Sequence, residues 1–209
     1  MSRITFYFVR HGESEGNKEG LFRGRRDFPL TELGKVQAEK VGEALKNIDF
    51  TLIASSPLKR AYDTAKYIAR SRKVEVMEEF NNIYLAEWEG KKKSFIKENY
   101  PNEWSLWITE PEKLNLKGAE TIDSVQKRAL SGIEKIIKQY KNGTVCIVSH
   151  RAVLKPLLSG LLGIQKPYFW RLHFDTASYS IVEYEEKRGF TLIKLNVTHH
   201  LPRFEMERF

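Results

Sequence analysis

The chain has 209 residues, of which 41% are hydrophobic and 30% are charged, and its formal net charge is +8. This length and balance predict one domain with a substantial core and a charged surface. The single cysteine, Cys146, excludes a disulfide framework and a cysteine metal site. No apolar run approaches the ~18 residues of a membrane span. Because the sequence enters a strand almost at once, without a signal peptide, we expect a cytoplasmic protein.

The first half of the sequence predicts strands that alternate with helices. Ile4, Phe6, Phe8 and Val9 form a short buried strand, which ends at Arg10-His11-Gly12. A fixed cation beside a titratable imidazole suits an anionic substrate and histidine chemistry. The other predicted elements are a loop over 21–30, a helix capped by Thr31 and running to about Lys46, a strand over 50–54, a helix capped by Ser56 with Pro57 at its first position, and a short strand over 74–77.

The second half opens with an irregular stretch, residues 78–120, which carries three of the four tryptophans. We interpret it as an insertion with short helices such as Lys92–Asn99 and Asn102–Ile108. The later predicted elements are a helix over 121–140, a turn at Asn142-Gly143, a central strand over 144–148 with Cys146 buried, a helix over 153–162, and a hairpin of 177–184 and 190–197. This order predicts an α/β fold over residues 1–209, with a mostly parallel central sheet and helices on both faces.

Basic and imidazole side chains follow three of the predicted strands. Arg10 and His11 come after the first, Arg60 lies just after the second, and His150 follows the strand that ends at Val148. In open α/β sheets the ligand crevice lies beyond the carboxyl ends of the strands. Each residue alone would be an ordinary surface or core residue. Together they predict one anion-binding crevice.

Several blocks of residues occur in order along the chain, from position 6 to about 201. They are Arg10-His11-Gly12-Glu13-Ser14 with Asn17, Gly24 and Pro29-Leu30-Thr31, then Ser55-Ser56-Pro57 with Arg60, Glu87-Trp88-Glu89-Gly90, Gly118-Ala119-Glu120-Thr121, Val148-Ser149-His150, and Phe169-Trp170-Arg171 with Asp175. These blocks resemble the histidine phosphatase (phosphoglycerate mutase-like) superfamily. The resemblance implies a three-layer sandwich and a metal-independent phosphatase without cofactors, which hydrolyses phosphomonoesters of small metabolites through a phosphohistidine.

The resemblance also implies a role for each site residue. His11 is the expected nucleophile, and Arg10, Arg60 and His150 surround the phosphoryl oxygens, with Asn17 and Gly24 in the phosphate-binding loops. Two guanidiniums offer planar forks of donors that suit a transferring phosphoryl group. His11 needs an acceptor, such as a carbonyl, for its second ring N–H, whereas we expect His150 to be protonated.

One position departs from the family pattern. Asn82 stands where the phosphatase branch usually has a glutamate that protonates the leaving oxygen, and a carboxamide cannot supply a titrating proton. Glu79 and Glu87 are the candidate substitutes. A smaller departure is Arg151, directly after His150, where a small residue is common; it could add charge to the pocket mouth.

The substrate stays open at this stage. The family implies ribazole phosphate, phosphoserine and sugar phosphates without ranking them, and the alternatives are a cofactor-dependent phosphoglycerate mutase or a weakly active phospho-ligand-binding module. The basic run Lys91-Lys92-Lys93 lacks interleaved aromatics, so nucleic acid is not an expected partner; a homodimer is left open. The aromatic residues Phe22, Tyr100, Trp104 and Trp107 either form a core for the insertion or line the substrate mouth.

Overall fold

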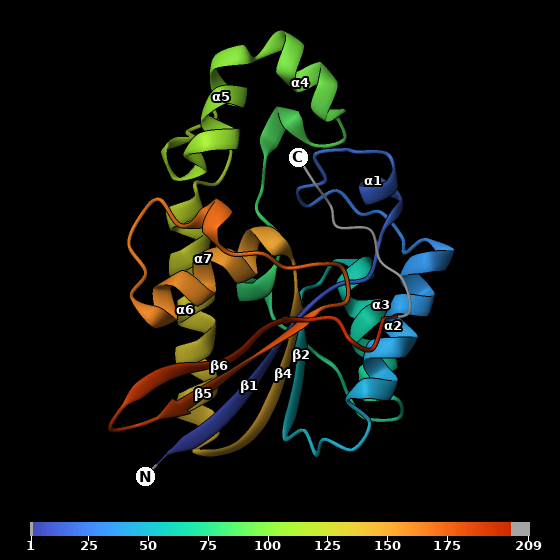
Figure 1. Cartoon of the computed structure of the whole chain (residues 1–209), viewed down its shortest axis with the longest axis vertical. Coiled ribbons are helices and arrows are strands. Elements are labelled where there is room, and N and C mark those ends of the chain that lie inside the picture. Colours follow the sequence, from blue (N-terminus) through green and yellow to red (C-terminus); the bar gives the residue numbers. More distant parts are fainter. Residues whose placement is uncertain (1, 202–209) are drawn as a thin grey trace.

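The computed structural model describes residues 2–201. Six strands form one sheet in the order β3-β2-β4-β1-β5-β6 (Figure 1). The parallel strands are β1 (Arg3–Arg10), β2 (Leu52–Ser55), β3 (Glu75–Val76) and β4 (Asn142–Ser149), and β5 (Tyr179–Glu185) and β6 (Gly189–Val197) form an antiparallel hairpin beside β1. The predicted α/β class, with a mostly parallel sheet, is confirmed.

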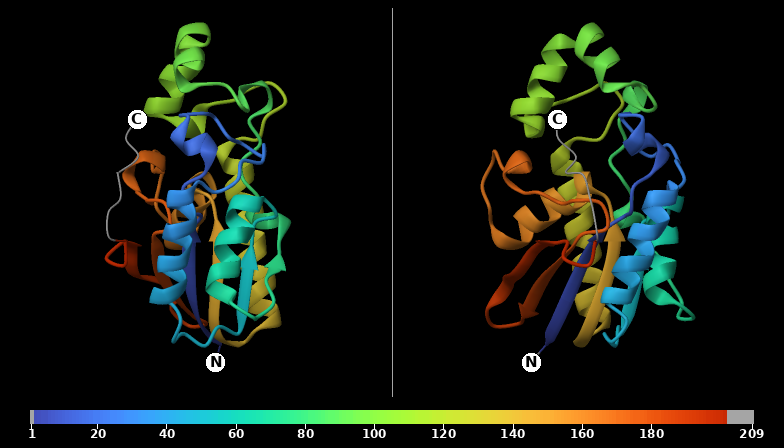
Figure 2. Two further views of the ribbon diagram at one scale, coloured as in Figure 1. Left: turned by 90° about the vertical axis from the view of Figure 1, so that its right-hand side faces the viewer. Right: turned by 45° about the vertical axis from the view of Figure 1, so that its right-hand side comes forward.

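Helices cover both faces of the sheet. The helices α2 (Glu32–Ala44) and α3 (Lys59–Ala69) lie on one face, and α6 (Ile122–Gln139) and α7 (Arg151–Leu162) on the other (Figure 2). Side chains alternate across a strand, so Phe6 and Phe8 join the core under α6 and α7, whereas Val9 joins the core under α2 and α3. Cys146 is buried in the second core, as predicted, and burial raises the pKa of its thiol.

Several boundaries differ from the predicted ones, three of them near the ends of the central strands. Helix α3 begins at Lys59 with Leu58 as its N-cap, not at Pro57. The reason is that the Ser56 hydroxyl accepts the N–H of Leu58 within a turn, 3.3 Å away, and also bonds to a distant histidine. The predicted turn at 142–143 belongs to β4, and α7 starts at Arg151, two residues before the prediction. A short helix, α1 (Glu15–Lys18), was not predicted.

Residues 78–120 stand beyond the carboxyl ends of the parallel strands (Figure 1). They contain the predicted short helices, α4 (Lys93–Asn99) and α5 (Pro101–Thr109), and three 3₁₀ turns at Glu78–Phe80, Ala86–Trp88 and Pro111–Lys113. Trp88 is fully buried, with its ring centre 4.8 Å from that of Phe22. The backbone N–H of Phe22 donates to the carbonyl of Lys91 at 2.9 Å, which ties the loop after β1 to this segment. None of the described helices is long and apolar enough to cross a membrane.

Candidate active site

The site lies where β2, β4 and β1 end side by side. Arg10 is paired with Ser149, and Ser55 with Val148, so the residues that follow these strands meet at one edge of the sheet. The ring centres of His11 and His150 are 5.1 Å apart. The structure therefore brings together two imidazoles that are 139 positions apart in the sequence, as the strand order predicted.

The ring of His11 is held in a defined tautomer. Its Nδ1 lies 2.6 Å from the carbonyl oxygen of Gly12, and because a carbonyl can only accept, Nδ1 carries the proton and Nε2 is unprotonated. Gly12 is required for close approach, since a Cβ there would come within 2.4 Å of the Gly34 carbonyl oxygen. Burial, followed by the charges of Arg60 and Arg10, lowers the pKa of His11 well below its ordinary value, so the ring is neutral at neutral pH.

Both predicted arginines are fully buried. The Nη1 of Arg10 donates to the carbonyl of Phe174 at 2.7 Å. Arg60 donates through Nη2 to the carbonyl of Gly24 at 2.9 Å and through Nη1 to that of Arg26 at 3.0 Å. Burial and the neighbouring Arg23 lower the pKa of Arg60 to about 9, so it remains a cation at neutral pH. The Nε of Arg60 has no hydrogen-bond partner among the described residues.

His150 bonds through Nε2 to the Ser56 hydroxyl at 2.7 Å, and its Nδ1 is buried with no hydrogen-bond partner in the described part of the chain. Burial, then the charge of Arg60, lowers its pKa well below the ordinary value. Burial beside fixed cations therefore favours a neutral His150 in the protein alone, and the expected protonation of His150 beside a transferring phosphoryl group stays a prediction. Sequence reasoning had given Ser56 a capping role and missed this contact.

A pocket opens at this edge of the sheet. Five of the predicted site residues line it, namely Arg10, His11, Gly24, Asn82 and His150, whereas Arg60 and Asn17 do not. The side-chain oxygen of Asn17 instead accepts hydrogen bonds from the N–H and the hydroxyl of Ser14. Of residues 2–201, four cations and no carboxylate line it, and no cluster of three or more His, Cys, Asp or Glu side chains could hold a metal ion. The wall consists of Arg10, His11, Leu21, Phe22, Arg23, Gly24, Asn82, Ile83, Leu85, Lys93, Trp107, His150, Arg151, Ala152 and Phe169.

Aromatic rings form one side of this pocket. Phe22 and Trp107 line it, and their ring centres are 5.4 Å apart in an edge-on contact within the buried core. Tyr100 and Trp104 pack against that core without lining the pocket. Phe22 and Trp107 thus fit the interpretation that these aromatic residues line the pocket, and Tyr100 and Trp104 fit the interpretation that they form a core.

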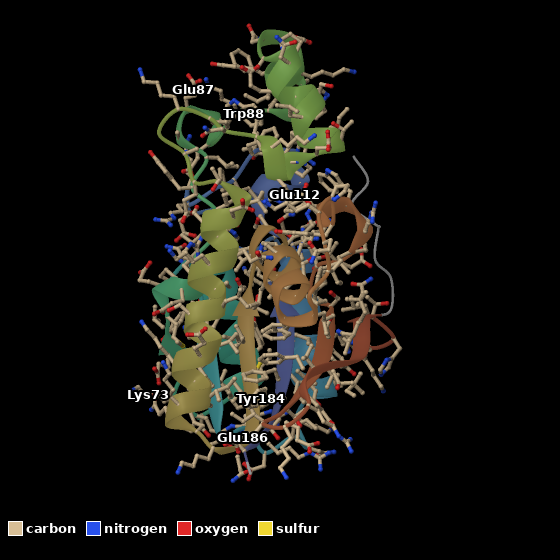
Figure 3. All side chains as sticks on the ribbon, turned by 90° about the vertical axis from the view of Figure 1, so that its left-hand side faces the viewer. Lys73, Glu87, Trp88, Glu112, Tyr184 and Glu186 are labelled. Carbon is tan, nitrogen blue, oxygen red and sulfur yellow. The ribbon has the colours of Figure 1, made fainter. Side chains whose placement is uncertain are left out.

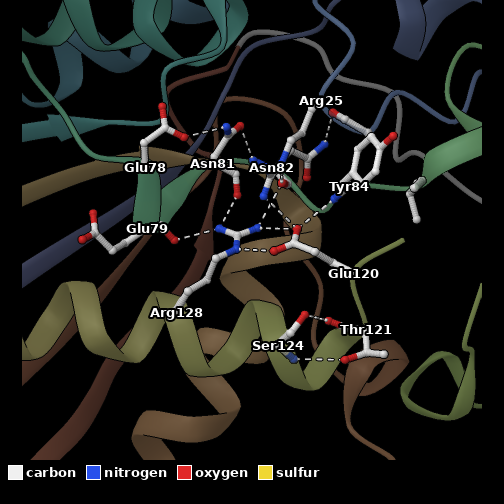
Figure 4. A network of polar contacts seen from close by, with 12 residues as sticks. Arg25, Glu78, Glu79, Asn81, Asn82, Tyr84, Glu120, Thr121, Ser124 and Arg128 are labelled. Carbon is white, nitrogen blue, oxygen red and sulfur yellow. Dashed lines mark hydrogen bonds and ion pairs between the residues drawn. The ribbon is translucent and has the colours of Figure 1, made fainter. Parts of the chain in front are cut away.

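Arg23 and Arg128 are residues that the sequence reasoning missed. The charge of each lowers the pKa of His150, and that of Arg23 also lowers the pKa of His11. Arg128 makes a bidentate ion pair with Glu120 and donates to the backbone carbonyls of residues 79, 81 and 82 (Figure 4). A second basic cluster, Arg23-Gly24-Arg25-Arg26, was the signal available for Arg23; no local pattern marks Arg128.

Asn82 occupies the pocket wall, as its sequence position predicted. Its Nδ2 donates to the carbonyl of Gly24 at 2.8 Å, the same oxygen that Arg60 binds. Neither candidate substitute lines the pocket. Glu79 forms an ion pair with Lys135 on α6, and Glu87 is exposed at the outer end of the molecule beside Trp88 (Figure 3). Neither therefore reaches the pocket wall in this structure, and the identity of the acid stays a prediction.

Comparisons with known proteins identify the family of this chain. The sequence profile of the histidine phosphatase superfamily (branch 1) matches residues 6–198. Phosphoserine phosphatase 1 of Hydrogenobacter thermophilus is 37% identical over 206 residues, covering 98% of this chain and 97% of the relative. The structure of Bacillus stearothermophilus YhfR matches with a TM-score of 0.89 at 29% identity, covering 94% of this chain and 99% of that one.

A third match is to the structure of a protein with a bound ligand. A mutant phosphoserine phosphatase from Entamoeba histolytica, solved in complex with phosphoserine, matches with a TM-score of 0.84 at 28% identity. The match covers 95% of this chain and 99% of that chain. Both the sequence and the fold of the described residues therefore point to the same group of proteins.

Proposed function

Because the chain belongs to branch 1 of the histidine phosphatase superfamily and is a phosphomonoester hydrolase, we propose that His11 carries the phosphoryl group during turnover. The observation that supports this role most directly is the Nδ1 contact of His11 with the Gly12 carbonyl. It leaves Nε2 unprotonated, and the lowered pKa of the ring keeps it so at neutral pH. A neutral, oriented imidazole is the form that attacks phosphorus.

In the first step, Nε2 of His11 attacks phosphorus, the N–P bond forms, and the bond from phosphorus to the substrate oxygen breaks. The leaving oxygen takes up a proton from solvent water and departs as the alcohol, and the attacking water of the second step returns a proton to the solvent. Arg10 and Arg60 stabilise the charge on the equatorial oxygens, since phosphoryl transfer depends mainly on positioning and electrostatics. The buried Nδ1 of His150 is a further contact for these oxygens, and a bound dianion would raise the pKa of that ring.

In the second step, water attacks phosphorus from the side that the alcohol has left. The new P–O bond forms, the N–P bond breaks, and phosphate departs while His11 returns to its neutral form. Gly24 and Asn17 belong to the loops around this centre, and we propose that they support the phosphate. This role needs no bound metal, because the cations of the protein supply the charge.

We propose that the substrate is a small phosphomonoester of the phosphoserine type. A 37% identical relative is named as a phosphoserine phosphatase, and a related fold has been solved with phosphoserine. Four cations in the pocket wall favour a compact and highly anionic substrate. The aromatic side of the pocket supplies apolar contact for the carbon skeleton.

Hydrolysis of para-nitrophenyl phosphate and of phosphoserine tests the proposal, in the wild type and in His11→Ala. The variant should lose essentially all turnover of both substrates, and rapid acid-free quenching followed by mass spectrometry should find phosphorylated protein only in the wild type. His199→Ala, a change of an exposed histidine, is the matched control. Undiminished turnover in a folded His11→Ala protein would refute the mechanism.

A further inference from the structure

The loop that precedes β5 contacts the end of β1 at three places. The N–H of Ala177 donates to the carbonyl of His11 at 3.1 Å. The carbonyl of Ser178 accepts the N–H of Arg10 at 3.0 Å. The carbonyl of Phe174 accepts Nη1 of Arg10 at 2.7 Å. Because both the backbone and the guanidinium of Arg10 are attached to this loop, the position of the loop helps to set the direction of the guanidinium.

One peptide unit of this loop, the one that joins Phe174 to Asp175, is held from both sides. Its carbonyl accepts from Arg10, and its N–H, which points the opposite way in a trans peptide, donates to Oδ1 of Asn196 at 2.7 Å. Nδ2 of Asn196 in turn donates to Oδ2 of Asp175 at 2.8 Å. Because an N–H can only donate and a carboxylate can only accept, both contacts require the same orientation of the Asn196 carboxamide. The carboxamide therefore fixes the peptide plane that directs a carbonyl at Arg10.

The local structure of the hairpin places Asn196 at this peptide. The register of β5 with β6 shifts between Tyr179 and Ile181, so that β6 carries one extra residue there. Asn196 lies in this bulge with a φ of 51°, a left-handed conformation that asparagine adopts more readily than most residues. The hydroxyl of Ser180 accepts the N–H of Asn196 at 3.0 Å. The bulge thus fixes the backbone of Asn196 while its carboxamide contacts the loop before β5.

A buried carboxylate anchors the carboxamide. Asp175 is 2% exposed, and both of its oxygens have partners, since Oδ2 accepts from Asn196 and Oδ1 lies 2.8 Å from Nε2 of His173. Hydrogen bonds in such a chain polarise one another, so the bond from the Asp175 N–H to Asn196 also makes the Phe174 carbonyl a stronger acceptor for Arg10. The side chain of Asn196 is therefore held in one orientation between the bulge and the loop.

We propose that Asn196 is a positioning residue for phosphoryl transfer, which acts through the Phe174–Asp175 peptide unit on the guanidinium of Arg10. The inference rests on the proposed contact of Arg10 with the phosphoryl oxygens, and it adds the residue that directs those donors. Asn196 does not line the pocket. Hydrogen bonds weaken steeply as their angle departs from linear, so a tilted guanidinium stabilises the transferring group less. Loss of the Asn196 carboxamide therefore slows the reaction although every group that meets the substrate is still present.

The variant Asn196→Gly removes the carboxamide and leaves the left-handed backbone unstrained. We expect kcat/KM for para-nitrophenyl phosphate to fall about three- to tenfold, and the inhibition constant of inorganic phosphate to rise by a similar factor. Asn142→Gly is the matched control, because Oδ1 of Asn142 also accepts a backbone N–H, that of Arg3 at 3.1 Å, but at the opposite end of β1. It should change neither value. Unchanged values in Asn196→Gly would overturn the proposal.

A double-mutant cycle separates positioning of Arg10 from a general role in the fold. The side chain of Arg10→Met has no donor for the Phe174 carbonyl, so in this background Asn196→Gly should change kcat/KM by less than about twofold. An equal loss in both backgrounds would show that Asn196 serves the fold or another group, and would overturn the proposal. Full activity of Arg10→Met by itself would instead refute the proposed role of Arg10, and the inference with it.

An exchange of the acid and the amide gives a test that retains the side-chain volumes. Asn196→Asp places a second carboxylate against Asp175 and should lower kcat/KM. Adding Asp175→Asn restores one donor and one acceptor to the pair and keeps an oxygen for the peptide N–H, so kcat/KM should return to within about threefold of the wild type. A doubly substituted protein that unfolds at the wild-type temperature but remains as slow as Asn196→Asp would overturn the proposal.

Discussion

Replacing Asn82 with glutamate should turn this protein into a better catalyst for alkyl phosphates. Asn82 lines the pocket, donates to the Gly24 carbonyl at 2.8 Å and is 6% exposed. A protonated glutamic acid at this position can direct its O–H into the pocket and protonate a leaving alkoxide. General acid catalysis of this kind contributes about 10²–10⁴-fold.

The protonation state of the new carboxyl decides how much of that gain is realised. Burial and the Gly24 carbonyl favour the protonated form, whereas Arg60, which binds the same carbonyl at 2.9 Å, favours the ionised form. With an unperturbed glutamate pKa of about 4.3, roughly one carboxyl in 500 is protonated at pH 7 and one in six at pH 5. A 10⁴-fold rate advantage of the fully protonated variant would then shrink to about 20-fold at pH 7. Between pH 7 and pH 5 this advantage would increase again by a factor of about 80.

The assay compares kcat/KM for an alkyl phosphate and for para-nitrophenyl phosphate from about pH 5 to pH 8. The alkyl rate should rise in Asn82→Glu, most at the acidic end, while the aryl rate changes much less because nitrophenolate leaves without a proton. The glutamine side chain of Asn82→Gln is as long as that of glutamate but has no titrating proton, so this variant is the matched control. The reasoning is refuted if the alkyl rate does not rise at any pH, or if the glutamine variant raises it equally.

Two further substitutions test the buried arginine and histidine side chains of the site. Arg10→Lys keeps the charge but loses the planar fork that contacts the Phe174 carbonyl, and kcat/KM for phosphomonoesters should fall about 10- to 100-fold; full activity would show that only the charge matters. Folding lowers the pKa of His11 and of His150, so below about pH 6.5 the unfolded chain binds protons at these rings and the folded chain does not. The free energy of unfolding is therefore highest above that pH and decreases as the pH falls. Thermal unfolding between about pH 7.5 and pH 5 should show this loss, with a shallower slope in His150→Gln; an equal slope would contradict it.

The strand ends explain why much of the site could be predicted from the sequence. Arg10, His11 and His150 directly follow apolar strands, and the carboxyl ends of neighbouring parallel strands meet at one edge. Arg60 lies in the first turn of the helix after β2, so its side chain stays close to the same edge. Local periodicity and strand order were therefore sufficient to place these four residues together.

The contacts that orient the same side chains could not be predicted, because they join segments far apart in sequence. The Phe174 carbonyl that holds Arg10 lies in a loop 164 positions away, and Ser56 meets His150 across 94 positions. The serine also satisfied a helix-cap pattern, so the local signal favoured the wrong role. The lowered pKa of His150 could not be predicted for a related reason, since it depends on burial and on Arg60 and Arg23 rather than on its neighbours in the chain.

The absence of a carboxylate from the described wall of the pocket changes how the leaving group can be assisted. Arg10, Arg23, Lys93 and Arg151 line the described pocket wall, and Asn82 adds an amide where the family pattern has an acid. Cations stabilise a developing negative charge electrostatically, but they supply less than a titrating acid when the leaving oxygen is strongly basic. A substrate that carries a second anionic group gains binding energy in a pocket with this charge, and that energy can position phosphorus against Nε2 of His11. Binding energy from a second anionic group of the substrate would thus offset part of the rate lost with the carboxylic acid at position 82.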